Sequence, residues 1–300
     1  MRYETELLRE QELIRVKIAG IIFSITGIRP AERLPLEQAY RDFLCSSEPH
    51  IIIHSRRGGL PPITLRDEDR IFDSEMVWSL YRIEERHVLS FRSPVFGPLP
   101  YRMAIFDGDF RRGEVFDRVR ETRPNGDLRP DLMEFPLSEV LMMCLLAQGR
   151  GLMAHACGID DNGRGYLCAG NSTHGKTTMA RLWKDRALVL NDDRIVLRQR
   201  DGRFWMYGTP WHGEYSNVSP QGVPLERVFF LRHAEANTVR CVEGAAAVSM
   251  LLTRCFLPLW DAEGMRFTLD FCSHLAAMVP CHELGFVPDG SVVDLVRCVQ

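Results

Sequence analysis

The stretch that decides the fold is Gly170–Thr177, which reads GNSTHGKT and fits the pattern G-x-x-x-x-G-K-[ST] at every fixed position. The apolar residues before it, Tyr166–Ala169, predict a strand that enters the loop, and Thr177–Trp183 predicts a helix that leaves it. Backbone N–H groups of such a loop and of the following helix point at anionic oxygens. The sequence therefore predicts a phosphate-binding loop within an α/β fold, rather than a chance glycine-rich turn.

Each fixed position of this loop has a chemical reason. Gly175 lets the backbone approach the phosphates, Lys176 places a cation beside the β and γ oxygens, and Thr177 offers a hydroxyl to Mg²⁺. We therefore expect a nucleoside triphosphate, ATP with Mg²⁺, as the ligand. The predicted nucleotide-binding residues are Gly170, Asn171, Ser172, Thr173, His174, Gly175, Lys176, Thr177 and Thr178.

Two adjacent carboxylates, Asp192 and Asp193, end the short apolar strand Leu188–Leu190 soon after the predicted loop helix. In phosphoryl transfer, a carboxylate at a strand end holds Mg²⁺, and a second one can accept the proton of the attacking hydroxyl. Neighbouring residues on a strand point to opposite faces, so we do not expect the two carboxylates to be equivalent. The alternative that the residues leave open is a solvated turn.

The segments before the loop predict a buried helix and a β-hairpin. A helix that begins near Ser138, its candidate N-cap, continues through Val140–Ala147, which is apolar almost all round. The strands Leu152–Ile159 and Tyr166–Ala169 flank the turn Asp160–Gly165, which contains an Asn-Gly pair typical of a type I′ turn. The phosphate loop thus follows the second strand of a hairpin.

The first part of the chain predicts a strand-rich accessory region. Strands are expected within Leu13–Ile25, at Ile51–His54 and, as a β pair, at Met76–Arg82 and His87–Phe91, with a short helix at Leu36–Phe43. The region therefore has a mixed pattern of elements in which strands predominate.

A length of 300 residues suits one large domain or two ordinary ones. Arg123–Pro136, with three prolines, a glycine and several charges, is the best candidate for a linker. We expect residues 1–130 to form the strand-rich accessory or substrate-recognition domain and residues 131–300 to form the P-loop domain.

Composition predicts a globular protein, with 45% hydrophobic residues, 26% charged residues and a formal net charge of −3. No basic excess points to nucleic acid, and no apolar stretch reaches the roughly 18 residues of a membrane span. The nine cysteines are odd in number and most lie in apolar runs, which favours buried thiols over a disulfide framework. Met1–Gln11 lacks a secretory apolar core, so we expect a cytoplasmic protein. The balanced charge and the short apolar runs lead us to expect no nucleic-acid or membrane partner.

Four segments in order resemble HPr kinase/phosphorylase and, more loosely, the phosphoenolpyruvate carboxykinase superfamily. They are His155 within LMAHACG, the hairpin that enters the phosphate loop, the pair Asp192 and Asp193, and a following glycine-rich segment. The resemblance covers about a third of the chain, from Pro136 to Glu214. It implies a mixed α/β fold with an HPr kinase C-terminal-like P-loop domain, ATP and Mg²⁺ as cofactors, and self-association as a plausible state.

The resemblance also implies roles for individual residues by position. Asp192 would be the general base and Asp193 the metal carboxylate, although these two roles could be reversed. The implied catalytic residues are Asp192, Lys176 and His155, and the implied metal ligands are Thr177, Asp193 and Glu214.

Several positions depart from the family. Thr173 stands where the family usually has glycine, and His174 is unusual before Gly175. Because threonine tolerates positive φ poorly, we expect a reshaped loop or a lowered affinity. The HPr enzyme's signature after the aspartates is missing, and Tyr207–Glu214 in its place forms either a substrate-facing loop or a packed turn anchored by Trp211. These departures argue against HPr itself as the substrate.

The expected function is an ATP-dependent kinase that phosphorylates a serine or threonine of a peptide or small protein, by analogy a precursor peptide. Two alternatives stay open: a nucleotide-binding regulator without catalysis, and a kinase of a small hydroxy compound. Arg232 and His233, which follow the predicted strand Val228–Leu231, could reach the phosphates from the far side of the loop.

Overall fold

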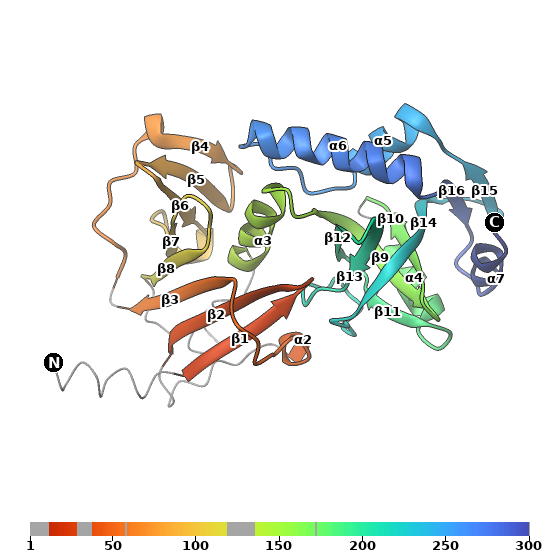
Figure 1. Cartoon of the computed structure of the whole chain (residues 1–300), viewed down its shortest axis with the longest axis horizontal. Helices are drawn as coiled ribbons and strands as arrows, with labels where there is room; N and C mark the ends of the chain where they lie inside the picture. Colours follow the sequence, from red (N-terminus) through yellow and green to blue (C-terminus); the bar gives the residue numbers. More distant parts are fainter. Residues whose placement is uncertain (1–11, 29–37, 58, 119–135, 172, 300) are drawn as a thin grey trace. The chain divides into compact units, whose positions relative to one another are not determined.

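The chain divides into two compact units, Met1–Leu145 and Leu146–Gln300, whose elements are labelled in Figure 1. The predicted domain boundary after residue 130 falls in residues 119–135, outside the part of the chain that the structure describes. The computed structural model describes residues 12–28, 38–57, 59–118, 136–171 and 173–299.

The first unit is built on one eight-stranded mixed sheet with the order β1-β2-β3-β8-β7-β6-β5-β4. β3 pairs in parallel with β2 and with β8, and the other pairings are antiparallel. The unit also has a short helix, α2, and two 3₁₀ turns, η3 and η4. The bounds are β1 Glu12–Ile18, β2 Ile21–Ile28, α2 Gln38–Arg41, β3 Ile51–Arg57, η3 Asp67–Asp69, β4 Arg70–Asp73, β5 Trp78–Ile83, β6 Arg86–Phe91, η4 Pro94–Phe96, β7 Arg102–Phe106 and β8 Arg112–Asp117.

The strands expected in this unit are present, and the structure adds β4, β7 and β8, which the sequence pattern did not predict. β7 is buried along its whole length, so it lacks the alternation of apolar and polar residues that marks a half-exposed strand. Its first residue, Arg102, is 1% exposed, and its Nε donates to Asp117 Oδ1 on β8 at 2.7 Å. Because a charged residue occupies a buried position, the hydrophobic pattern of the sequence does not identify β7 as a strand.

The helix α3, Leu137–Ala147, lies across the division between the units and was predicted from its apolar residues. It begins one residue before Ser138, so the prediction of Ser138 as N-cap is wrong. Ser138 is buried inside the first turn, and its Oγ lies 3.2 Å from the hydroxyl of Tyr40. The serine thus serves tertiary packing within the first unit, and not the end of the helix.

The second unit holds the predicted phosphate loop, between β10 and α4. Its elements after α3 are β9 Leu152–Asp161, β10 Arg164–Ala169, α4 Lys176–Trp183, β11 Leu188–Asn191, β12 Arg194–Arg200, β13 Arg203–Tyr207, β14 Gly222–His233, β15 Thr238–Cys241, α5 Gly244–Leu252, α6 Ala262–Met278, β16 Cys281–Phe286 and α7 Ser291–Cys298. The β9–β10 hairpin closes through Asn162 at φ 56° and Gly163 at φ 85°, as a type I′ turn requires.

The strands of this unit follow the order β10-β9-β12-β13-β14-β16-β15, with β11 added beside β9. β10 also pairs in parallel with β14, so the pairings of β10, β9, β12, β13 and β14 close into a ring. β16 is parallel to β14 as well. The carboxyl ends of these three parallel strands therefore meet at one edge, where the loop after β10 begins.

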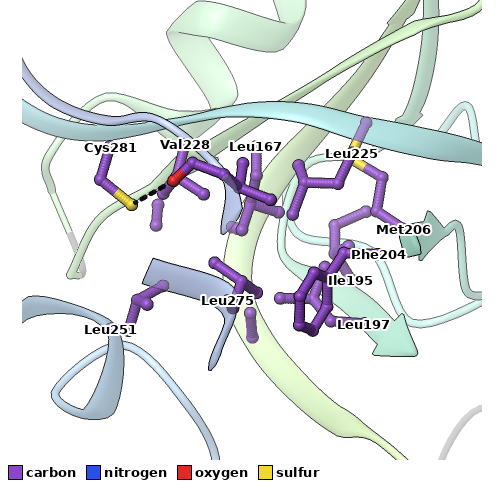
Figure 2. Packing of buried hydrophobic residues seen from close by; sticks show 14 of the residues in the cluster. Leu167, Ile195, Leu197, Phe204, Met206, Leu225, Val228, Leu251, Leu275 and Cys281 are labelled. Carbon is purple, nitrogen blue, oxygen red and sulfur yellow. Dashed lines mark hydrogen bonds between the residues drawn. The ribbon is translucent and has the colours of Figure 1, made fainter. Parts of the chain in front are cut away.

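Alternate residues of β10 enter two different cores. Leu167 and Ala169 pack in a cluster with residues of α5 and α6, whereas Tyr166 and Cys168 pack in a cluster with residues of α4 and α7. Figure 2 shows Leu251 of α5 and Leu275 of α6 gathered against side chains of β10, β12, β13 and β14. The strand that enters the loop is thus fixed on both faces.

The structure is a mixed α/β fold, as the sequence predicts. No disulfide joins any of the nine cysteines, all of which lie within the described ranges. Among the described residues, no helix combines the length and the apolar character needed to cross a membrane.

Candidate active site

The phosphate loop has the predicted setting, with β10 entering it and α4 leaving it. Gly175, the residue before the helix, has φ 88° and ψ 21°, a left-handed conformation that glycine adopts without strain. A Cβ at this position would lie 2.5 Å from Cζ of Phe286, so the site also requires the absence of a side chain. Thr173 has φ 71°, the positive value that the sequence led us to doubt for threonine.

Lys176 lies across the loop at the start of α4 and is 7% exposed. Its Nζ donates to the carbonyl oxygen of Asn171 at 3.1 Å. Burial lowers the pKa of Lys176, and the nearby charges of Asp193 and Asp192 oppose that effect. The ammonium group is therefore held inside the loop, where a phosphate oxygen is a better partner than a carbonyl.

The first aspartate of the pair contacts the loop. Thr177 Oγ1 donates to Asp192 Oδ2 at 2.8 Å, and Asp192 is 1% exposed. The same carboxylate accepts the backbone N–H of Gly213 at 2.7 Å and that of Tyr215 at 3.1 Å. These partners are neutral and satisfy Asp192 from fixed positions, so its oxygen stays beside the Thr177 hydroxyl.

Asn191, just before the aspartates, shapes this corner. It is fully buried, and its Oδ1 accepts the backbone N–H groups of Asp193 and Arg194 at 2.6 and 2.9 Å. Its Nδ2 donates to the carbonyls of Thr209 and Trp211 at 2.8 and 3.1 Å. One amide thus sets both the turn of the aspartates and the segment that supplies N–H groups to Asp192.

The second aspartate has charged partners. Asp193 Oδ1 lies 2.8 Å from Nε2 of His155 on β9, and Asp193 Oδ2 pairs with the guanidinium of Arg194. Arg194 in turn lies over the ring of Phe256, with its Cζ 4.5 Å from the ring centroid. Antiparallel pairing of β12 with β9 places Arg194 opposite His155, which explains how residues far apart in the chain meet.

The charge of Asp193 is stabilised by these partners. Burial raises its pKa, but the hydrogen bond from His155 and the charges of Arg194 and Lys176 outweigh burial. The net result is a pKa below the ordinary value, so Asp193 is ionised at neutral pH. With 22% of its side chain exposed, it is more accessible than Asp192.

Beneath the loop, the thiols of Cys157 and Cys168 face each other on paired strands. Burial raises the pKa of Cys157 well above its ordinary value and that of Cys168 to about 12. Both thiols are fully buried in the sheet next to the loop. A thiol with a raised pKa stays protonated at neutral pH and is a poor nucleophile, so we assign neither cysteine a catalytic role.

Not every predicted site residue joins the cluster. The Glu214 side chain is 79% exposed, and its carboxylate pairs with Arg181 of α4 at 3.2 Å. Gly170 and Thr178 are the first and last residues of the predicted nucleotide-binding stretch, and Ser172 lies outside the described residues. Trp211 is 7% exposed. Of the two interpretations of Tyr207–Glu214, its burial agrees with a packed turn that Trp211 anchors.

Several residues of this region carried no motif in the sequence. Arg254, between α5 and α6, lies over the ring of Phe230 at 5.2 Å, and its carbonyl accepts the N–H of His155. Together with burial, its charge lowers the pKa of His174. Of the two residues expected to approach the loop from β14, His233 does so, while Arg232 pairs with Glu283 at 3.0 Å.

The donor set fits a hard divalent cation that is shared with phosphates. Among the described residues there is no group of three or more histidine, cysteine, aspartate or glutamate side chains suited to a metal. Thr177 and Asp192 instead place a hydroxyl oxygen and a carboxylate oxygen 2.8 Å apart, and both are oxygen donors of the kind that Mg²⁺ prefers.

No protein-family model matches the sequence, and no curated protein matches it. Among solved structures, the chain is similar to the Hpr(Ser) kinase/phosphatase from Coxiella burnetii, with 11% identity and a TM-score of 0.28. The match covers 48% of this chain and 90% of that one.

Proposed function

We propose that this chain is an ATP- and Mg²⁺-dependent kinase that transfers the γ-phosphate to a serine or threonine hydroxyl of a peptide or small protein. The observation that carries the proposal is that the two adjacent aspartates have different partners in the site. Asp192 contacts the loop hydroxyl of Thr177, and Asp193 contacts His155 and interacts with the charge of Lys176. Such an arrangement separates a metal side from an acceptor side within one site.

On the metal side, Thr177 and Asp192 are the residues that would hold Mg²⁺. A bound Mg²⁺ would neutralise charge on the β and γ oxygens. This assignment exchanges the roles that the family resemblance implied for the two aspartates, because the Thr177 hydroxyl donates to Asp192. Lys176 would leave the Asn171 carbonyl and bind a phosphate oxygen.

On the acceptor side, Asp193 would orient the attacking hydroxyl and receive its proton. Its lowered pKa keeps it ionised before the reaction, and the hydrogen bond from His155 fixes its position. Arg194, held between Asp193 and the Phe256 ring, adds positive charge beside the site. Proximity and fixed charge are the main contributions that a protein makes to this reaction class.

The class of acceptor rests on the four segments that resemble HPr kinase in their order. The altered segment Tyr207–Glu214 and the loop residues Thr173 and His174 support an acceptor other than HPr. We assign recognition of the acceptor to the strand-rich first unit, and the place of action to the cytoplasm. Self-association belongs to the same proposal.

The test is a transfer assay with the full chain, Mg²⁺ and ATP labelled in its γ-phosphate, with cell lysate as the source of acceptor. Wild type is compared with Lys176→Ala, and the control is Lys184→Ala, at the other end of α4, where the lysine is 55% exposed. We expect a labelled peptide or protein with wild type and Lys184→Ala, and none with Lys176→Ala.

The other outcomes separate the alternatives. Release of ADP without a labelled macromolecule would indicate a small hydroxy compound as acceptor. Tight ATP binding that Lys176→Ala abolishes, without turnover, would indicate a nucleotide-binding regulator. A wild-type chain that binds no nucleotide would overturn the proposal.

A further inference from the structure

The phosphate loop contains a strained residue that needs a partner. Thr173, with φ 71°, has a left-handed backbone that is rare for residues branched at Cβ. Strain of this kind persists only where the surrounding structure determines the conformation. The left-handed backbone of Thr173 therefore requires a contact that holds it in place.

His233, at the end of β14, makes that contact. Its Nε2 lies 2.6 Å from the carbonyl oxygen of Thr173. A carbonyl oxygen only accepts, so Nε2 carries the proton and donates. The neutral tautomer protonated at Nε2 and the imidazolium both make this bond, so it does not depend on ionisation of the ring.

The fold holds His233 in position through its neighbour on β16. Parallel pairing of β14 with β16 places His233 opposite Phe286, and the two rings stack with centroids 6.4 Å apart. Phe286 also packs directly under Gly175. The ends of two central strands therefore support both positive-φ residues of the described part of the loop.

The orientation of one peptide group matters for the ligand. A trans peptide directs its N–H opposite to its carbonyl, so a Thr173 carbonyl that points to His233 directs the N–H of His174 the other way. That N–H donates to the carbonyl of Asn171 at 3.2 Å, the same oxygen that accepts Nζ of Lys176. Two donors suited to phosphate oxygens thus meet at one carbonyl inside the loop.

We propose that His233 is a positioning residue, which holds the Thr173 carbonyl directed toward the end of β14 so that the loop keeps the shape that receives the nucleotide phosphates. The inference rests on the proposed function. It also explains how this chain tolerates threonine at the position: a side chain from β14 supplies the restraint that a glycine would not need.

The experiment separates the donor from the ring. His233→Phe keeps a ring that can stack on Phe286 but cannot donate, and His233→Gln keeps a donor without the ring. Thr173→Gly removes the strain that the donor opposes. The matched control is His274→Phe, an exposed histidine on α6 whose ring contacts Phe204. The probe is a non-hydrolysable ATP analogue with Mg²⁺, measured by titration calorimetry beside thermal melting.

We expect His233→Phe to weaken binding of the analogue by about three- to tenfold, in line with the loss of one hydrogen bond. The loss should appear in KM for ATP more than in kcat. His233→Gln should recover most of the affinity, and Thr173→Gly combined with His233→Phe should bind more tightly than His233→Phe alone. His274→Phe should bind as wild type does.

Binding of His233→Phe within about twofold of wild type would overturn the inference. So would a loss that neither the glutamine nor the Thr173→Gly background reduces. If His233→Phe does not fold, His233→Gln and Thr173→Gly still decide the matter. Failure of the proposed function looks different, since wild type would then not bind the analogue, or Lys176→Ala would bind it equally well.

Discussion

The two ends of β10 carry similar backbones with different consequences. At one end, the turn to β9 uses Asn162 at φ 56° and Gly163 at φ 85°. At the other end, the phosphate loop uses Thr173 at φ 71° and Gly175 at φ 88°. The turn is stabilised locally, since the N–H of Gly163 donates to Asp160 Oδ1 at 2.7 Å. The loop depends on distant residues, His233 and Phe286.

The difference shows what a binding loop needs that a connection does not. Asparagine and glycine accept positive φ at little cost, so the turn is stable by its own residues. The loop has to present donors to a ligand, and its strained conformation is maintained by strand ends from elsewhere in the unit. Changes of equal chemistry at the two ends should therefore have unequal effects.

The largest contrast is expected from Gly175→Ala and Gly163→Ala. Both place a Cβ on a left-handed residue, but the Cβ at 175 would lie 2.5 Å from Phe286 Cζ, while nothing lies within 4 Å of the Cβ at 163. We expect Gly163→Ala to lower the free energy of unfolding by about 1 kcal/mol and to leave nucleotide binding unchanged. Gly175→Ala should weaken nucleotide binding by more than about 100-fold because the loop must move. Calorimetry and urea unfolding measure both, and equal binding by the two variants would contradict the contrast.

Aspartates at the two ends provide the second test. Asp193 lies at the loop end with His155, and Asp161 lies at the turn end, 1% exposed, with Nε of Arg297 2.8 Å away. Asp193→Asn should lower the rate of transfer by about 100-fold or more while ATP still binds, because the proton acceptor is lost. Asp161→Asn should leave the rate unchanged and lower the free energy of unfolding by about 1–3 kcal/mol. A transfer rate for Asp193→Asn within a few fold of wild type would remove the assigned base.

The pH dependence of stability sharpens the assignment of Asp161 as structural. The hydrogen bond from Arg297 lowers the pKa of Asp161, and burial opposes it. A lowered folded-state pKa gives stability that is present above the unfolded value of about 3.9 and is lost as pH falls through the folded value. The difference in unfolding free energy between wild type and Asp161→Asn should thus have its largest value at neutral pH and should decrease below about pH 4. Urea titrations across this range measure it, and a constant difference would exclude the ion pair as its cause.

The smallest effect is expected from Glu214→Gln. Its carboxylate forms an exposed pair with Arg181, a kind of contact that contributes less than about 1 kcal/mol. Transfer and unfolding should both stay close to wild type. A fall in the transfer rate of about tenfold or more, restored by higher Mg²⁺, would instead support the metal role that the family resemblance implies for Glu214.

Local chemistry made much of this protein predictable from its sequence. The phosphate loop, the strand before it, the helix after it and the Asn162–Gly163 turn follow from short-range patterns and backbone preferences. The doubt about Thr173 was also local, because a branched side chain resists positive φ wherever it stands. Strand β7 was not predictable in this way, since burial on both faces removes the alternation that identifies strands.

The tertiary structure alone decided the partners within the candidate site. Asp192 and Asp193 are adjacent in the chain, yet the sequence did not show which one faces Thr177 and which one faces His155. Pairing of β12 with β9 brings His155 to Asp193, and parallel pairing of β14 with β10 brings His233 to the loop. Asp193 and His155 are 38 positions apart in the sequence, and His233 and Thr173 are 60 positions apart. Such pairings depend on the whole sheet, so no local pattern of residues specifies them.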